Sequence, residues 1–213
     1  MKLLVKLVIG VLVLTGLAYL FVRTASDTRS EPYQVQRQQL SGWTLALEES
    51  GGPSSPLLVL RPPQDLGGDL FRQVFTRMME SMKGSGVADV PIVLRQEYEL
   101  ALAAKYTPAE LFDAARAAGL ESAAFAPRCV AVRRISEPGL TRQVYFVLFD
   151  APAFGQFREE LRRALGGSAS SVMFDPAGLS PVLIVGASDA SLDRWLPLRA
   201  DAAADCIAPI TVN

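Results

Sequence analysis

The stretch that most resembles a catalytic motif is "PVLIVGASDASLDRW", Pro181 to Trp195. An apolar run ends at Gly186, and Ser188 follows in the frame of the G-x-S-x-G turn of α/β-hydrolases, with Ala in place of the last Gly. A serine in such a turn needs a neighbouring base, which in these enzymes is histidine. The chain contains no histidine. We therefore predict that Ser188 is structural and caps a short helix that ends near Trp195.

The sequence also lacks the residues that other catalytic arrangements require. Beyond the N-terminal segment the chain has two lysines, Lys83 and Lys105, and neither lies in a Ser-x-x-Lys frame. Asp150 and Asp175 follow predicted strands and could form a hydrolytic carboxylate pair, but each also has an ordinary role. Asp150 would cap a helix, and Asp175 precedes Pro176 in a predicted turn. We predict no catalytic residues, with a histidine-free carboxylate or serine hydrolase as the least favoured alternative.

The same composition predicts no metal ion and no cofactor. Without histidine, the histidine-ligated zinc and haem sites are excluded, and two cysteines cannot form a Cys₄ site. The methionines at 78, 79 and 82 fall on the apolar stripe of a predicted helix, so we assign them to the core rather than to copper binding. Residues 32–213 hold 17 basic and 20 acidic side chains, a net charge of −3 that argues against nucleic acid as a partner.

The two cysteines, Cys129 and Cys206, stand just before the predicted strands 130–135 and 207–212. If these strands are neighbours, the cysteines can form a disulfide that holds the C-terminal strand. A disulfide implies an oxidising compartment. The alternative is a pair of buried thiols in a cytoplasmic domain.

The N-terminal segment "MKLLVKLVIGVLVLTGLAYLFVR" is the strongest signal in the sequence. Its apolar run is about the 20 residues needed to cross a bilayer, so we predict a transmembrane anchor over residues 1–23. The alternative is a signal peptide cleaved at residues 24–26. The basic residues that precede the run favour a cytoplasmic N-terminus, which places the rest in the periplasm of a bacterium as a single-pass inner-membrane protein.

We predict that residues 24–32 form a polar tether and that residues 33–213 form one domain. Apolar patterning and turn signals predict a mixed β-sheet flanked by helices, of the α+β or α/β class. The predicted strands are 33–40, 43–48, 57–61, 91–94, 130–135, 141–149, 182–185 and 207–212. The predicted helices are 69–84, 96–106, 107–119 and 150–165, with Asp69 as the first cap and with Arg158, Arg162 and Arg163 on a solvated face.

With no catalytic set, the expected function is that of a non-enzymatic accessory or structural subunit of an inner-membrane complex of the respiratory, photosynthetic or transport type. Its expected partners are the bilayer and integral membrane subunits. The alternative is a tethered periplasmic binding module for a small ligand or an envelope polymer.

Overall fold

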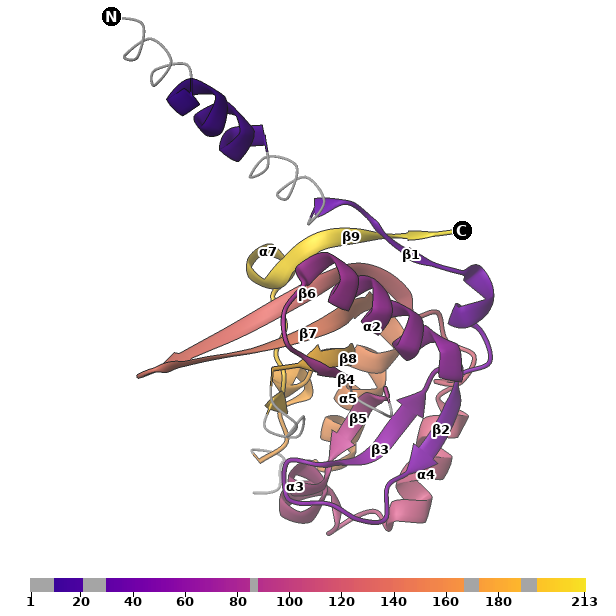
Figure 1. Ribbon diagram of the computed structural model, residues 1–213. Helices are drawn as coiled ribbons and strands as arrows, with labels where there is room; N and C mark the ends of the chain where they lie inside the picture. The colour runs from indigo at the N-terminus through magenta and orange to yellow at the C-terminus, as the bar shows by residue number, and fades with distance from the viewer. Residues whose placement is uncertain (1–9, 21–29, 85–87, 167–172, 189–194) are drawn as a thin grey trace, which may run out of the picture.

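The computed structural model describes residues 10–20, 30–84, 88–166, 173–188 and 195–213. It is an α+β fold with a curled six-stranded sheet in the order β1-β9-β6-β7-β8-β4 and a three-stranded sheet in the order β2-β3-β5 (Figure 1). Of the strand pairs that the structure gives, β1–β9 is parallel and the others are antiparallel. Of the two predicted classes, α+β is therefore the one observed.

The strands are β1 Tyr33–Val35, β2 Thr44–Leu47, β3 Pro56–Arg61, β4 Lys83–Gly84, β5 Val90–Leu94, β6 Ala126–Glu137, β7 Leu140–Asp150, β8 Val182–Ala187 and β9 Cys206–Val212. The α-helices are α2 Gln64–Met78, α3 Arg95–Glu97, α4 Pro108–Ala117, α5 Pro152–Ala164 and α7 Ala202–Asp205. Three short segments are 3-10 or π helical: η1 Arg37–Leu40, η2 Tyr98–Leu102 and η3 Pro176–Gly178.

The core forms around β7 and β8, whose residues 144–149 and 182–187 are all buried. This confirms that the unbroken apolar run of β7 marks a central strand rather than an edge strand. An aromatic cluster packs between the two sheets: Trp43 stacks on Phe125 and meets Phe149 of β7 edge-on at 5.6 Å between ring centroids. The two sheets thus share one hydrophobic core.

The helix predicted at 69–84 has different ends in the structure. As α2, it begins five residues earlier, so Asp69 lies inside it and is not its cap. Gly67 lies inside the helix, where an added Cβ would lie 2.4 Å from the Ala88 side chain. Gly67 is therefore required by close packing rather than by a turn. At the other end, Met79 adopts a left-handed conformation with φ 52° and stops the helix before Gly84.

Of the N-caps predicted for the two later helices, α4 and α5, the first is confirmed and the second is wrong. Thr107 and Glu110 form the predicted capping box of α4, each side chain accepting a hydrogen bond from the other residue's backbone N–H. Asp150, by contrast, does not cap α5. It pairs with Ala126 as the last residue of β7, and Ala151 is the N-cap without a side-chain bond.

Residues 10–20 form an exposed helix, and the rest of the predicted anchor at residues 1–9 and 21–23 lies outside the described residues. Within the part of the chain that the structure describes, no helix combines the length and apolarity that crossing a membrane requires.

Candidate functional site

Ser188 extends the sheet. Its backbone N–H donates to the Gln143 carbonyl of β7 at 2.9 Å, and its hydroxyl oxygen accepts from the Gln143 N–H at 3.0 Å. The helix that Ser188 was predicted to cap falls on residues 189–194, outside the described residues. Lys83 of β4 pairs with Ala187, one residue away, but no hydrogen bond joins the Lys83 and Ser188 side chains in the described structure. The contacts that the structure shows for Ser188 are therefore those of a strand end.

The Ser188→Ala variant is expected to lose about 0.5–1.5 kcal/mol of unfolding free energy, the typical net contribution of one hydrogen bond. A serine-directed fluorophosphonate probe is expected to leave the wild-type chain unlabelled, because no histidine is present to activate the hydroxyl. Labelling that disappears in both Ser188→Ala and Lys83→Ala would instead identify a Ser-Lys nucleophile and contradict the non-enzymatic interpretation.

The two aspartates considered as a hydrolytic pair have separate surroundings. The Asp175 carboxylate accepts from the Ala177 N–H at 3.0 Å and pairs with Arg199 at 2.5 Å, which confirms its place in a turn. Asp150 is exposed at the end of β7. Among the described residues, no group of three or more acidic or cysteine side chains is arranged to hold a metal ion.

The Cys129–Cys206 disulfide is present. Cys206 begins β9 opposite Ala131 of the antiparallel strand β6, two residues from Cys129, and the Cα atoms of the two cysteines are 5.8 Å apart. The predicted pairing and its reason, two neighbouring strands, are both confirmed.

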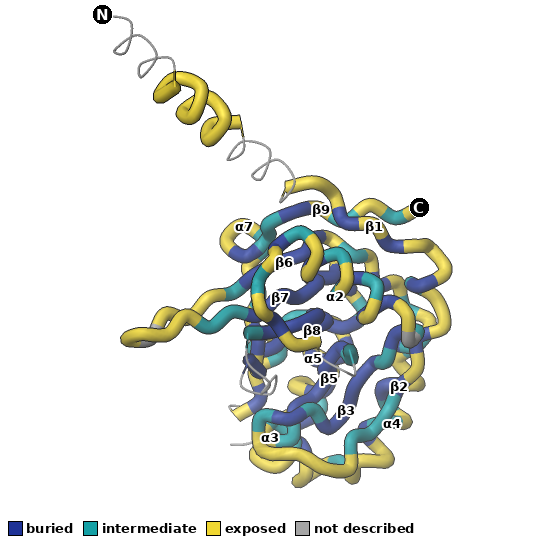
Figure 2. The backbone as a smooth tube through the Cα atoms, in the orientation of Figure 1, coloured by how far each residue is buried: buried dark blue, intermediate teal, exposed yellow. Residues whose placement is uncertain are grey.

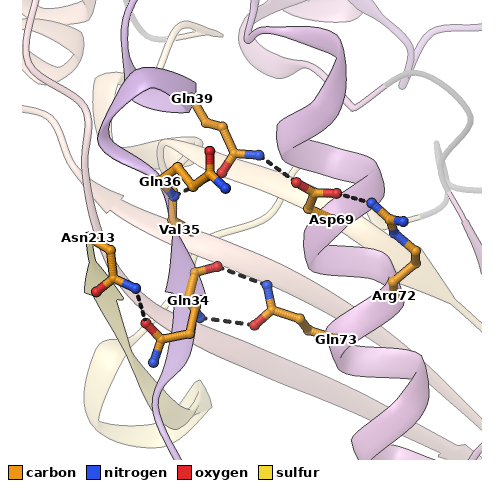
Figure 3. Close-up of a pocket in the computed structure, with 8 residues that line it drawn as sticks. All are labelled: Gln34, Val35, Gln36, Gln39, Asp69, Arg72, Gln73 and Asn213. Atoms are coloured by element: carbon orange, nitrogen blue, oxygen red, sulfur yellow. Dashed lines mark hydrogen bonds and ion pairs between the residues drawn. The ribbon is translucent and has the colours of Figure 1, made fainter.

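One side of α2 holds the strand that follows the tether (Figure 3). The Gln73 side chain binds β1 as a neighbouring strand would: it accepts from the Gln34 N–H at 2.9 Å and donates to the Gln34 carbonyl at 2.8 Å. One turn further on, Arg77 donates to the carbonyls of Glu31 and Pro32 and lies 4.1 Å above the centroid of the Tyr33 ring. Helix side chains thus occupy the outer edge of β1, which closes that edge to further strand pairing.

A hollow of about 300 Å³ lies at this junction and is lined by Gln34, Val35, Gln36, Gln39, Asp69, Arg72, Gln73 and Asn213. Its polar groups bind one another. Buried Gln39 donates to Asp69 at 2.7 Å, Arg72 pairs with the same carboxylate, and Asn213 donates to the Gln34 side chain at 2.7 Å. A ligand would have to displace these bonds, so the hollow serves first as a clamp on β1.

The strands define one end of the six-stranded sheet, here called the tether end. β1 and β9 begin there, β6 ends, β7 begins and β8 ends, as the pairings require. Because Arg77 of α2 binds Glu31 and Pro32, α2 also ends there. Residues 30–32, which directly precede β1, therefore lie at this end of the domain (Figure 1).

Exposed apolar side chains gather at the tether end. Outside residues 10–20, six large apolar side chains are exposed in the described structure: Phe75, Met79, Leu100, Ile135, Leu140 and Met173. Four of them lie on α2 near its C-terminus or on the β6–β7 hairpin, and Met79 is 89% exposed. The assignment of Met79 to the core is therefore wrong, whereas Met78 and Met82 are buried as predicted.

The β6–β7 hairpin projects from the tether end as a two-stranded arm, residues 133–142 (Figures 1 and 2). The pairings of β6 with β9 stop at Ala131 and those of β7 with β8 stop at Val144, and beyond them the two strands pair with each other up to Glu137 and Leu140. Gly139, with φ 79°, provides the turn. An isolated two-stranded ribbon is only marginally stable in water, so the arm calls for a contact that would stabilise it.

A polar cluster closes the base of the arm on the side of α2. The Tyr145 hydroxyl donates to Glu80 at 2.7 Å, and the Gln143 side chain donates to the same carboxylate. Burial raises the pKa of the Tyr145 phenol well above its ordinary value, and the hydrogen bond to Glu80 raises it further. The phenol is therefore a permanent donor at physiological pH, and the cluster is structural.

Arg158 is the clearest correction to the predicted surface. It is fully buried, whereas Arg162 and Arg163 on the same helix are exposed as predicted. Its guanidinium donates to both oxygens of Glu97, at 2.6 and 3.1 Å, and to three backbone carbonyls. Its five donors are thus all satisfied, which leaves no free group for a ligand.

No protein-family model, curated protein or solved structure matches the chain. The features that sequence reasoning missed, the clamp on β1 and the arm, depend on contacts between distant segments. One signal for the arm was nonetheless present, since the predicted strand 141–149 is longer than the predicted strand 182–185 that pairs with it.

Proposed function

We propose that the chain is a non-enzymatic accessory subunit of an inner-membrane complex of the respiratory, photosynthetic or transport type. Residues 1–23 anchor it in the bacterial inner membrane, and residues 33–213 lie on the periplasmic side. The observation that carries the proposal is the concentration of exposed apolar side chains at the tether end, where a protein embedded in the same membrane would be met.

Phe75 and Met79 are the best candidates for the protein contact. Phe75 lies in the last turn of α2 and Met79 is the C-cap of the helix, whose N–H donates to the Phe75 carbonyl at 3.0 Å. Phe75 also stacks on Phe71. This patch is small beside a typical stable interface of about 1,200–2,000 Å². A membrane anchor supports so small a contact, because it confines both proteins to one surface and raises their effective concentration.

Two features of Met79 are unfavourable for the stability of the fold. Its left-handed conformation suits glycine, and its side chain is exposed to solvent. Glycine would remove both penalties. A methionine at this position is consistent with a side chain used for contact.

The Met79→Gly variant separates binding from folding. It is expected to raise the unfolding free energy by about 1 kcal/mol, because the left-handed strain is relieved. The Phe75→Ser, Met79→Gly double variant is expected to lose about 2 kcal/mol of binding free energy for the partner, roughly a thirtyfold rise in Kd. The measurement is purification of the full chain in mild detergent, with mass spectrometry of the co-purifying membrane proteins.

The matched control is Leu100→Ser with Met173→Ser, two exposed apolar positions away from the tether end. The control is expected to retain the partner. Equal retention by both double variants would contradict the assignment of the interface to α2.

The alternative of a tethered binding module draws support from the hollow beside β1. Since the polar groups of the hollow already bond one another, we favour the accessory subunit.

A further inference from the structure

We infer that the tip of the β6–β7 arm contacts the bilayer surface, so that the domain is supported at two points, the anchor and the arm. This inference rests on the proposed anchor at residues 1–23. The partner of the arm is the headgroup region of the membrane, and the argument comes from the direction, length and chemistry of the arm.

The direction follows from the strand order. β9 runs parallel to β1 and antiparallel to β6, so β6 leaves the sheet at the end where β1 begins. Figure 1 shows the arm extending from that same end. The arm therefore projects from the end of the sheet at which β1, the first strand after the predicted tether, begins.

The length of the arm matches that of the tether. Ile210, the partner of Tyr33, lies four residues after Cys206, the partner of Ala131, and seven residues lead on from Ala131 to Pro138. At the rise of an antiparallel strand, these eleven residues place the tip of the arm about 37 Å beyond the level of Tyr33. Ten residues lead from Tyr33 back to the end of the predicted anchor, a reach of at most about 33–36 Å. The tip of the arm can thus reach the plane in which the anchor ends.

The chemistry of the arm suits an interface between water and lipid. Ile135 lies opposite Arg142 and Leu140 opposite Glu137, which places both apolar side chains on one face of the ribbon. They are 46% and 51% exposed. The arm carries three arginines and one glutamate, a net charge of +2 that favours anionic headgroups. Of the three, Arg133 is already engaged by Asp205 at the base of the arm.

The test places an environment-sensitive fluorophore on the arm of the full chain. A Leu140→Cys variant can be labelled selectively under non-reducing conditions, because Cys129 and Cys206 are joined. The labelled chain is reconstituted into vesicles of phosphatidylcholine, with and without phosphatidylglycerol, that carry spin-labelled lipid as a quencher. Leu100→Cys, with a similarly exposed side chain outside the arm, is the control.

We expect the label at position 140 to shift its emission to the blue and to lose most of its intensity to the lipid-borne quencher, more so with phosphatidylglycerol present. The label at position 100 should change in neither respect. An unquenched label at position 140 in a chain that resists carbonate extraction overturns the arm contact and leaves the anchor intact. A chain that fails to associate with the vesicles overturns the anchor and the arm contact together.

Discussion

The Arg158→Ala variant is expected to lose about 3–5 kcal/mol of unfolding free energy, the range for breaking a buried ion pair by removing one partner. Arg158 is fully buried, and its Glu97 partner retains 15% side-chain exposure. The guanidinium also donates to the carbonyls of Ile92 at 2.7 Å, Asp175 at 2.8 Å and Pro176 at 2.9 Å. Alanine would leave a carboxylate and three carbonyls without their donor, and water would have to enter or the segments would have to separate.

The loss should be large because Arg158 joins three segments that are distant in sequence. It lies on α5 and binds the last strand of the small sheet through Ile92, the helix that follows through Glu97, and the turn before β8 through Asp175. Phe174 packs against the guanidinium at 4.8 Å from its ring centroid. The residue therefore contributes to the contact between the two sheets.

The measurement is urea unfolding of the detergent-solubilised chain, followed by the fluorescence of buried Trp43 and Trp195. Arg162→Ala is the matched control on the same helix. Its ion pair with Glu159 is about half exposed, so a loss within about 0.5 kcal/mol is expected. Arg158→Lys should remain well below wild type, since one ammonium cannot replace a five-donor fork. A loss below 1 kcal/mol for Arg158→Ala would contradict this account.

The burial of Arg158 was only partly readable from the sequence. Neighbouring charges at 159, 160, 162 and 163 indicate a solvated helix face. Yet the buried side chains of α5 are Phe154, Phe157, Leu161 and Arg158, and helical spacing places Arg158 on the same stripe as the others. What no local pattern contains is the partner set, because Ile92 and Glu97 lie more than 60 positions away.

Elements with strong local signals were predicted correctly. The capping box of α4 and the apolar run of β7 each specify their own structure from adjacent residues. The boundaries of α2 failed because tertiary contacts decide them: Gly67 packs against Ala88, and Met79 ends the helix in a conformation that its residue type disfavours. The arm and the clamp on β1 depend on sheet topology, which a single sequence does not specify.

The second large effect is expected from the disulfide. In the chain-entropy model, closing a loop with a sequence separation of 77 residues contributes about 4.5 kcal/mol, so Cys206→Ser should lower the unfolding free energy by up to this amount. The structure also predicts where the molecule opens first. β9 pairs with β6 beside the disulfide and with β1 on its other side, and its N–H and carbonyl groups at Asn213 bind Val35 and Arg37.

Loss of the disulfide should therefore loosen β9 and, through it, the first strand after the tether. Hydrogen exchange of the Cys206→Ser chain is expected to show faster exchange in residues 206–213 and 33–35, with little change in the small sheet formed by β2, β3 and β5. Arg133→Ala is the control for local disruption, since it removes the largely buried Arg133–Asp205 ion pair beside Cys206 but keeps the disulfide. It should leave the exchange of residues 33–35 unchanged. If hydrogen exchange in Cys206→Ser were faster by the same factor in both sheets, the disulfide would support the whole fold rather than its last strand. If both cysteines of the wild-type chain from intact cell envelopes could be alkylated, the disulfide would be absent and the prediction would have no basis.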